Sequence, residues 1–341
     1  MKTKKIIAGA AILLALTTSI FAKTKKSAKN TGKIKVVTTI FPEYDWTREI
    51  LGDNLKNVEL TLLLSNGVDL HSYQPSIQDI AKISTADIFV YVGGESDEWV
   101  EDALKNAKNK NMKVINLLET LGDKVKAEEI KEGMQVEEEE HEHHEAEEEH
   151  HHHHHHDDDE EETEYDEHVW LSLKNAKILS AEIASALCEK DPANASLYKA
   201  NLTAYTSKLD DLDSKYAEVV KAASKKTLLF GDRFPFRYLV DDYDLDYFAA
   251  FVGCSAESEA SFETIVFLAK KVDQLSLNSV LKIESGNGKI ANTIIQNTKK
   301  KNAKVLTMDS LQSTTLKEAE NGVSYLKVME DNLQILKEAL N

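Results

Sequence analysis

The stretch 192-PANASLYKANLTAYTSKLDDLDSKYAEVVKAA-223 predicts a single long helix. Pro192 is a residue type that commonly opens a helix, and the helical pattern after it continues to about Ala223. At about 1.5 Å per residue, such a helix would be roughly 45 Å long. That length suits a helix that bridges two lobes.

Predicted strands and helices alternate on both sides of this helix. Before it, strands are expected at 33–42, 58–65, 87–94 and 113–119, and helices at 43–54, 76–86 and 173–190. After it, strands are expected at 226–232, 245–252, 278–284 and 304–310, and helices at 261–274, 287–301 and 324–340. This alternation predicts mostly parallel sheets covered by helices. We therefore expect an α/β protein with an N-terminal lobe (33–190), a bridging helix (192–223) and a C-terminal lobe (224–341).

Length and charge narrow the possible classes of protein. The chain has 341 residues, 42% of them hydrophobic, which is enough for two domains of ordinary size. Its formal net charge of −18 comes mostly from residues 137–167, and the rest is close to balanced. Because there is no basic region of the kind that attracts DNA or RNA, no nucleic-acid partner is expected.

The N-terminus, 1-MKTKKIIAGAAILLALTTSIFAKTKK-26, has the pattern of a secretory signal peptide. Lysines precede an apolar core, and Ala22 is the expected cleavage position, so residues 1–22 would be removed. An uncleaved membrane anchor is the alternative, but the apolar run is short for a full span. No cysteine near the cut could accept a lipid. We expect an exported, soluble protein, most simply in a bacterial periplasm.

Cys188 and Cys254 are the cysteines of the chain. They could pair in an oxidising compartment. Cys188 lies inside an apolar helical pattern, which favours a buried free thiol instead.

Ten of the twelve histidines lie in the acidic run 137–163. Low hydrophobicity and like charges predict that this run is a disordered loop. Its imidazoles are expected to collect metal weakly and raise the metal concentration near a tighter site. These accessory histidines are His141, His143, His144, His150, His151, His152, His153, His154, His155 and His156.

The two histidines outside that run, His71 and His168, lie in distinctive segments. The strings 69-DLHSYQPS-76, 166-DEHVWLSLKNA-176 and 305-VLTMDSLQS-313, in this order, resemble the metal-specific solute-binding proteins of ABC transporters, the ZnuA-like zinc-uptake family. The resemblance spans about residues 33–341. It implies a metal cleft between the lobes, Zn²⁺ as the transported ligand, a membrane permease as partner, a monomer and no enzymatic activity.

The resemblance also implies His71, His168 and Asp309 as metal ligands. Imidazole nitrogens with a carboxylate suit a divalent ion such as zinc in a tetrahedral site, and each imidazole needs a second acceptor to fix its tautomer. The family's third-ligand segment, H-D-A-F-G-Y, aligns with 231-GDRFPF-236, which puts Gly231 at the ligand position. Either water completes the site or a neighbour replaces the ligand; the candidates are Asp232, Cys254 and Glu284.

Three alternatives to zinc capture follow from the same residues. Manganese is the rival cargo, because a site with two histidine nitrogens and two carboxylates would also suit that ion; such a site would consist of His71, His168, Asp309 and Asp232. The histidine run favours zinc, because imidazoles bind zinc in preference to manganese. A zinc-dependent hydrolase would need a general base, such as Glu257 or Glu284, beside an open metal position. The chain contains no H-E-x-x-H, no G-x-S-x-G and no phosphate-binding glycine loop. A metal-binding surface adhesin is the third alternative.

Overall fold

A computed structural model describes residues 32–135, 164–255 and 259–341 of the chain. Residues Lys33 to Asn341 form one compact unit. The predicted signal peptide and the accessory histidines lie outside the described residues. In the part of the chain that the structure describes, no helix is long and apolar enough to cross a membrane.

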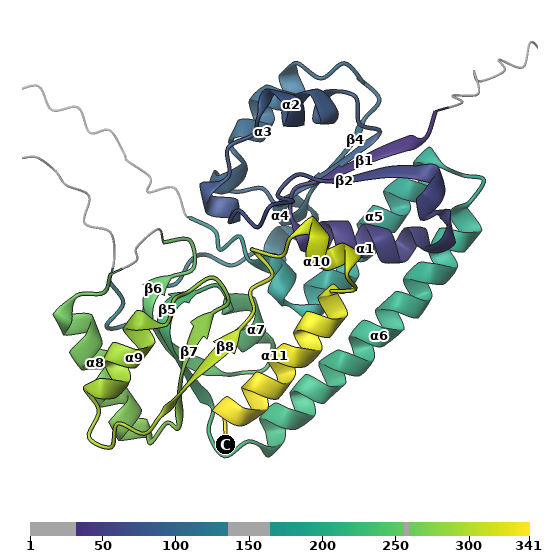
Figure 1. The fold of residues 1–341 in the computed structure, drawn as a ribbon. Helices are drawn as coiled ribbons and strands as arrows, with labels where there is room; N and C mark the ends of the chain where they lie inside the picture. The colour runs from purple at the N-terminus through teal and green to yellow at the C-terminus, as the bar shows by residue number, and fades with distance from the viewer. Residues whose placement is uncertain (1–31, 136–163, 256–258) are drawn as a thin grey trace, which may run out of the picture. The chain divides into compact units, whose positions relative to one another are not determined.

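The first sheet has four parallel strands in the order β2-β1-β3-β4. Strand β3, with the sequence IFVY, reads as a continuous apolar run, as expected of a parallel strand covered on both faces, whereas β1, β2 and β4 also contain polar or charged residues. Helices α1 and α5 (Leu173–Lys190) pack against its strands, and α2 and α3 lie on the opposite side (Figure 1). The elements are β1 Ile34–Thr38, α1 Phe41–Leu51, β2 Val58–Leu62, α2 Ile77–Ser84, β3 Ile88–Tyr91, α3 Trp99–Lys105, β4 Lys113–Asn116 and α4 Leu117–Leu121.

The second sheet also has four parallel strands, in the order β6-β5-β7-β8. Helices α8 and α9 pack against β5 and its neighbours, and α11 packs against β8. The elements are β5 Thr227–Phe234, α7 Arg237–Asp242, β6 Asp246–Val252, α8 Phe262–Leu275, β7 Ser279–Ile283, α9 Lys289–Gln296, β8 Lys304–Met308, α10 Leu316–Glu320 and α11 Tyr325–Ala339.

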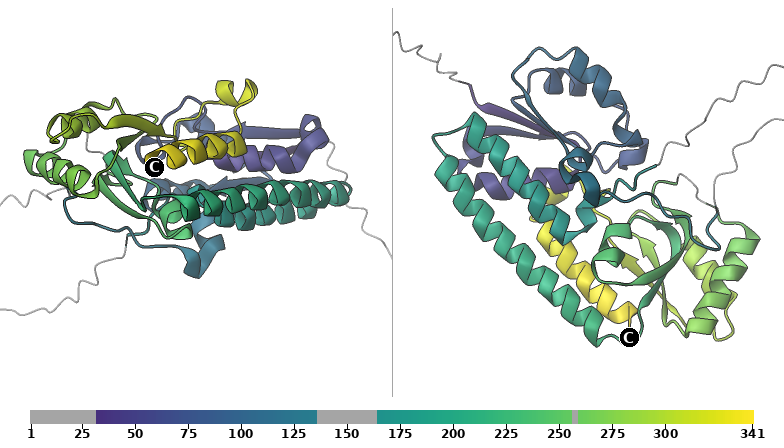
Figure 2. Two further views of the ribbon diagram at one scale, coloured as in Figure 1. Left: turned by 90° about the horizontal axis from the view of Figure 1, so that it is seen from below. Right: turned by 180° about the vertical axis from the view of Figure 1, so that it is seen from behind.

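Helix α6 (Ala195–Ala222) connects the two halves. It has 28 residues, about 42 Å at the usual rise. It packs against α5 (Leu173–Lys190) and α1 near the first sheet, and against α11 near the second (Figures 1 and 2). Asn201 donates to Ile50 O at 2.9 Å, and the Tyr216 hydroxyl donates to Met329 O at 2.6 Å. The α/β fold with two mostly parallel sheets and a long bridging helix is therefore confirmed.

The structure differs from the sequence-based expectation mainly at short elements. Pro42, expected to end a strand, lies in the first turn of α1, where its missing N–H has no intrahelical partner to lose. Helices α3, α4, α7 and α10 were not predicted. Each has at most seven residues, too few for apolar periodicity to register, and tertiary packing stabilises such helices.

Candidate metal centre

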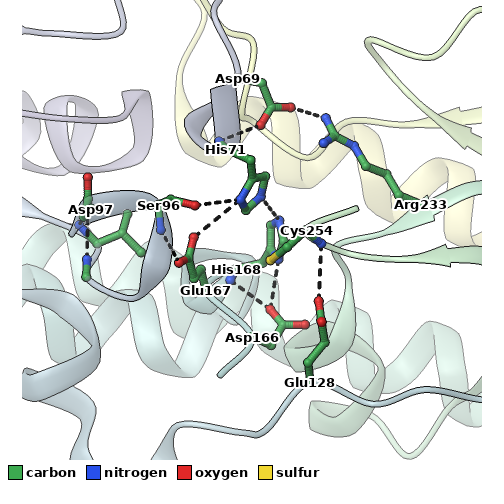
Figure 3. Close-up of polar contacts among 12 residues, drawn as sticks. Asp69, His71, Ser96, Asp97, Glu128, Asp166, Glu167, His168, Arg233 and Cys254 are labelled. Carbon is green, nitrogen blue, oxygen red and sulfur yellow. Dashed lines mark hydrogen bonds and ion pairs between the residues drawn. The ribbon is translucent and has the colours of Figure 1, made fainter. Parts of the chain in front are cut away.

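His71 lies at the carboxyl end of the first sheet, in a 3-10 turn (Leu70–Ser72) that follows β2. The Asp69 side chain caps this turn by accepting from the backbone N–H of His71 at 3.1 Å. The Ser96 side chain fixes the orientation of the His71 ring, since Ser96 Oγ lies 2.8 Å from His71 Nδ1 (Figure 3). Its Nε2 atom is therefore left to face the space between the two sheets.

His168 is fully buried and directly precedes a 3-10 turn, Val169–Leu171. Asp166 Oδ1 accepts from the His168 backbone N–H at 2.9 Å and lies 3.0 Å from Nδ1. The turn is anchored because Trp170 donates to Ser310 O at 2.9 Å and Tyr325 donates to Trp170 O at 2.7 Å. A hydrogen bond from Nδ1 to the Asp166 carboxylate would keep Nε2 free to bind a metal.

The two imidazoles point their Nε2 atoms at each other across 3.1 Å. Two nitrogens bound to one tetrahedral Zn²⁺ would be about 3.3 Å apart, given Zn–N bonds of about 2.0–2.1 Å. The third member of the cluster is Cys254: ligand atoms of His71, His168 and Cys254 all lie within 4.8 Å of one another. Among the described residues, this is the group of His, Cys, Asp and Glu donors that could hold a metal ion.

Cys254 comes from the second sheet, where it follows β6. Its backbone N–H donates to Glu128 Oε1 at 3.3 Å. Both cysteines are free, so the alternative of a Cys188–Cys254 disulfide is not realised. Cys188 is a half-buried free thiol that lies 3.6 Å from Ala195 O.

Gln312 also reaches the histidines and was not predicted. With its amide oriented to satisfy its neighbours, the amide nitrogen donates to Asp69 at 2.8 and 3.2 Å, and Oε1 lies 3.1 Å from His168 Nε2. Only 4% of the Gln312 surface is exposed. The amide oxygen therefore offers a neutral fourth donor beside the His71, His168 and Cys254 cluster.

The three predicted carboxylates lie outside that cluster. Asp309 Oδ1 accepts from Leu311 N at 2.8 Å, which caps the turn after β8. Asp232 accepts from the backbone N–H groups of Arg233 and Ile283. Glu284 accepts from the N–H and hydroxyl of Ser310 and from the Ser313 hydroxyl. Asp309 as a ligand stays a prediction.

Gly231 does not face the histidines. A Cβ atom built there would lie 2.5 Å from the Cα atom of Ala291 in α9, so a side chain at this position would meet helix backbone. The side chain of β5 that does reach the site is Arg233, which forms an ion pair with Asp69 (Figure 3). The family segment H-D-A-F-G-Y can also be aligned two residues further along, so that its Phe and Tyr match Phe236 and Tyr238. In that alignment its ligand position falls on Arg233. Guanidinium stays charged and cannot bind a cation, so it serves as a partner of Asp69.

The cluster is electrostatically prepared for a cation. Burial and the nearby His168 lower the pKa of His71 to about 3, so its imidazole is neutral near physiological pH. Burial, followed by the carboxylates of Glu167, Glu128 and Asp166, raises the pKa of the Cys254 thiol. Burial also raises the pKa of Asp309, to about 7, with Glu284 as the second cause. A dication would therefore meet a neutral His71 imidazole, and the Cys254 thiol would have to lose its proton to bind it.

Two parallel α/β sheets joined by a long helix, with imidazole and thiol donors converging from both, define a metal-specific solute-binding protein. The chain belongs to the ZnuA family, described as "Zinc-uptake complex component A periplasmic", whose sequence model matches residues 36–339. It is 30% identical over 320 residues to the high-affinity zinc uptake system protein ZnuA of Bacillus subtilis, covering 94% of this chain and 92% of that protein.

The chain is also similar to the zinc-binding lipoprotein AdcA of Streptococcus pneumoniae strain R6, at 32% identity over 328 residues. That match covers 96% of this chain but 60% of AdcA, so this chain spans less than two thirds of that relative's length. The Zn(II)-bound ZnuA-like domain of AdcA shares the fold with a TM-score of 0.67 at 28% identity, over 91% of this chain and 99% of that domain.

Proposed function

We propose that this protein captures Zn²⁺ at His71, His168 and Cys254, with the Gln312 amide oxygen as fourth donor, and delivers the ion to the permease of an ABC transporter. The observation that carries the proposal is the convergence of the two Nε2 atoms, 3.1 Å apart, with the Cys254 sulfur in the same cluster. Membership of a zinc-uptake family supports it.

The donor set favours zinc over manganese. Thiolate and imidazole are the softer ligands that suit zinc, whereas manganese prefers carboxylate, carbonyl and water oxygens. The predicted manganese-like set required Asp309 and Asp232, whose carboxylates cap backbone N–H groups elsewhere. Zinc is therefore the cargo we assign, and manganese is the alternative to be tested.

The site is suited to binding rather than turnover. Catalytic zinc sites keep a position for water beside three protein ligands. In our proposal the Gln312 amide oxygen, 3.1 Å from His168 Nε2, fills that position instead of water. Of the two candidate bases for a hydrolase, Glu284 is held by Ser310 and Ser313, and Glu257 lies outside the described residues.

Location and assembly belong to the same proposal. We infer export by the predicted signal peptide to a periplasmic or extracellular site, action as a monomer, and accessory metal collection by the histidine run. AdcA of S. pneumoniae is named a lipoprotein, whereas residues 1–26 here contain no cysteine.

Titration calorimetry with Zn²⁺ and Mn²⁺ against a competing chelator tests the proposal. We expect a tight Zn²⁺ site, much weaker Mn²⁺ binding, and a loss of at least about a hundredfold in Zn²⁺ affinity for His71→Ala and for Cys254→Ser, since even partners of the ligands are worth 10–100-fold. The matched control is Cys188→Ser, a free thiol elsewhere in the fold. Asp309→Asn distinguishes the alternative ligand. Wild-type affinity in Cys254→Ser, or a collapse in Asp309→Asn, would overturn the assignment.

A further inference from the structure

A register shift in strand β5 directs Arg233 toward the metal centre. The pairing of β5 with β6 is regular up to Phe230 and resumes, out of step, at Arg233. Asp232 holds this irregularity by accepting from Arg233 N at 3.0 Å and from Ile283 N at 3.3 Å. Such bulges re-aim side chains. Here the Arg233 side chain, 15% exposed, pairs with Asp69, 18% exposed, so that a largely buried ion pair joins the second sheet to the first (Figure 3).

The Asp69 carboxylate lies beside the donors of the metal centre. It accepts from the backbone N–H of His71 at 3.1 Å. With the Gln312 amide oriented as above, it also accepts from the amide nitrogen at 2.8 and 3.2 Å, while the amide oxygen lies 3.1 Å from His168 Nε2. Among the residues that the structure describes, the group that could hold a metal ion does not include Asp69. The carboxylate is therefore one amide group away from the histidines, and its oxygens are occupied by other partners.

The charges of Asp69 and Arg233 act on the metal centre in opposite directions. Burial and His168 are the main causes of the lowered pKa of His71; after them, Asp69 raises this pKa and Arg233 lowers it. The pair therefore adds little net charge where the ion binds. Without the guanidinium, the centre would gain a negative charge and a carboxylate free to bind metal. Manganese prefers such oxygen donors and a higher coordination number, whereas zinc is satisfied by four donors that include nitrogen and sulfur.

We propose that Arg233 is a specificity-determining residue, which disfavours manganese by keeping the Asp69 carboxylate away from the bound ion. The inference rests on the proposed function and concerns how the same site selects its cargo. Arginine suits this role because its guanidinium stays charged and its planar fork matches a carboxylate. Since a guanidinium cannot bind a cation, the selection acts through Asp69, and Arg233 is not a ligand.

Titration of the full chain with Zn²⁺ and with Mn²⁺, each against a competing chelator, tests this inference. We expect Arg233→Met to bind Mn²⁺ about tenfold more tightly and Zn²⁺ about tenfold more weakly than the wild type, because a carboxylate becomes available and the Gln312 amide loses a fixed partner. In Arg233→Met/Asp69→Asn the Mn²⁺ affinity should return to the wild-type value. The asparagine introduced at position 69 can still cap the His71 turn, but it offers no carboxylate.

The matched control is Arg237→Met, which removes the same charge from an arginine that pairs with Glu129. Both affinities should stay at the wild-type values in this control. Should Arg233→Met fail to fold, as judged by circular dichroism, Arg233→Gln removes the charge while keeping a polar side chain. The same rise in Mn²⁺ affinity is expected for that variant.

The absorption spectrum of bound Co²⁺ distinguishes a change of ligands from a loss of structure. Four-coordinate Co²⁺ absorbs strongly in the visible range, and its bands weaken when further donors bind. We expect weaker bands in Arg233→Met, and wild-type bands in both Arg233→Met/Asp69→Asn and Arg237→Met.

Two results would overturn the inference. One is a Mn²⁺ affinity that does not rise in a folded Arg233 variant, and the other is a rise that persists when Asp69 is also replaced. Failure of the proposed function would look different, because the wild type itself would then lack a tight Zn²⁺ site or would prefer Mn²⁺.

Discussion

The sharpest test of the metal centre is the proton that Cys254 must release. In the metal-free protein, burial and neighbouring carboxylates raise the pKa of the Cys254 thiol, while the pKa of His71 is lowered to about 3. In the proposed site His71 is already neutral, so the Cys254 thiol is the ligand whose proton has to leave when Zn²⁺ binds. Binding of Zn²⁺ to the thiolate should therefore release one proton.

The size of the pH effect on Zn²⁺ affinity follows from the linkage between metal binding and proton release. Loss of one proton makes the affinity rise about tenfold, or about 1.4 kcal/mol, for each pH unit. The sign is positive, because the apo state holds the proton and the bound state does not. With an ordinary thiol pKa of about 8.5 the rise would flatten near that pH, whereas the raised pKa of buried Cys254 should keep the slope at one through about pH 9.

Calorimetry in two buffers of different ionisation enthalpy counts the released protons directly. We expect one proton for the wild type and for Cys188→Ser, and none for Cys254→Ser, which should bind Zn²⁺ more weakly. If the wild type released no proton, or if Cys254→Ser released as many, the thiolate assignment would be refuted. Asp309, with a pKa raised to about 7, is the group whose proton loss would then appear at lower pH.

Further predictions concern positions around the site. Gly231→Ala should destabilise the protein by about 1–3 kcal/mol in urea unfolding, since the new methyl would lie 2.5 Å from the Ala291 Cα atom; unchanged stability would contradict this orientation. Burial and then Asp97 raise the pKa of Glu43 from 4.5 to about 8, so its contribution to stability is complete below pH 4.5 and lost as the pH rises through 8. Glu43→Gln should therefore lose less stability than wild type between pH 5 and 8; equal pH dependence in urea unfolding would refute this. Arg233→Met leaves Asp69 without its ion pair and should weaken Zn²⁺ binding about tenfold by titration, whereas Arg237→Met, the control, should not.

The long elements were predictable from local pattern. Helix α5 was expected at 173–190 and is found at Leu173–Lys190, and the Ser76 cap of α2 was also expected. Both depend on periodicity and capping within one segment, which a sequence displays directly. Helix α6 was expected to begin at Pro192 but begins at Ala195, because helix ends depend on local turns as well as on apolar spacing.

The site was only half visible in the sequence. His71 and His168 were found because each lies in a short motif whose own residues, Asp69 and Asp166, hold it. Cys254 remained one of three open candidates, since strand β6 brings it to the histidines only after the second sheet forms. Gln312 was missed because an amide carries no charge signal, although its position three residues after Asp309 could have suggested it.

The sequence by itself determined the alternation of strands and helices, the single long helix and the two histidine motifs, since hydrophobic period and short-range capping act within contiguous residues. The tertiary structure alone decided which donors meet. Which further side chain joins the histidines depends on the direction in which each candidate leaves its strand and on the backbone N–H groups that it caps. The candidates are Cys254, Asp232, Glu284 and Asp309. Those distances arise only when two separately wound sheets pack along one helix.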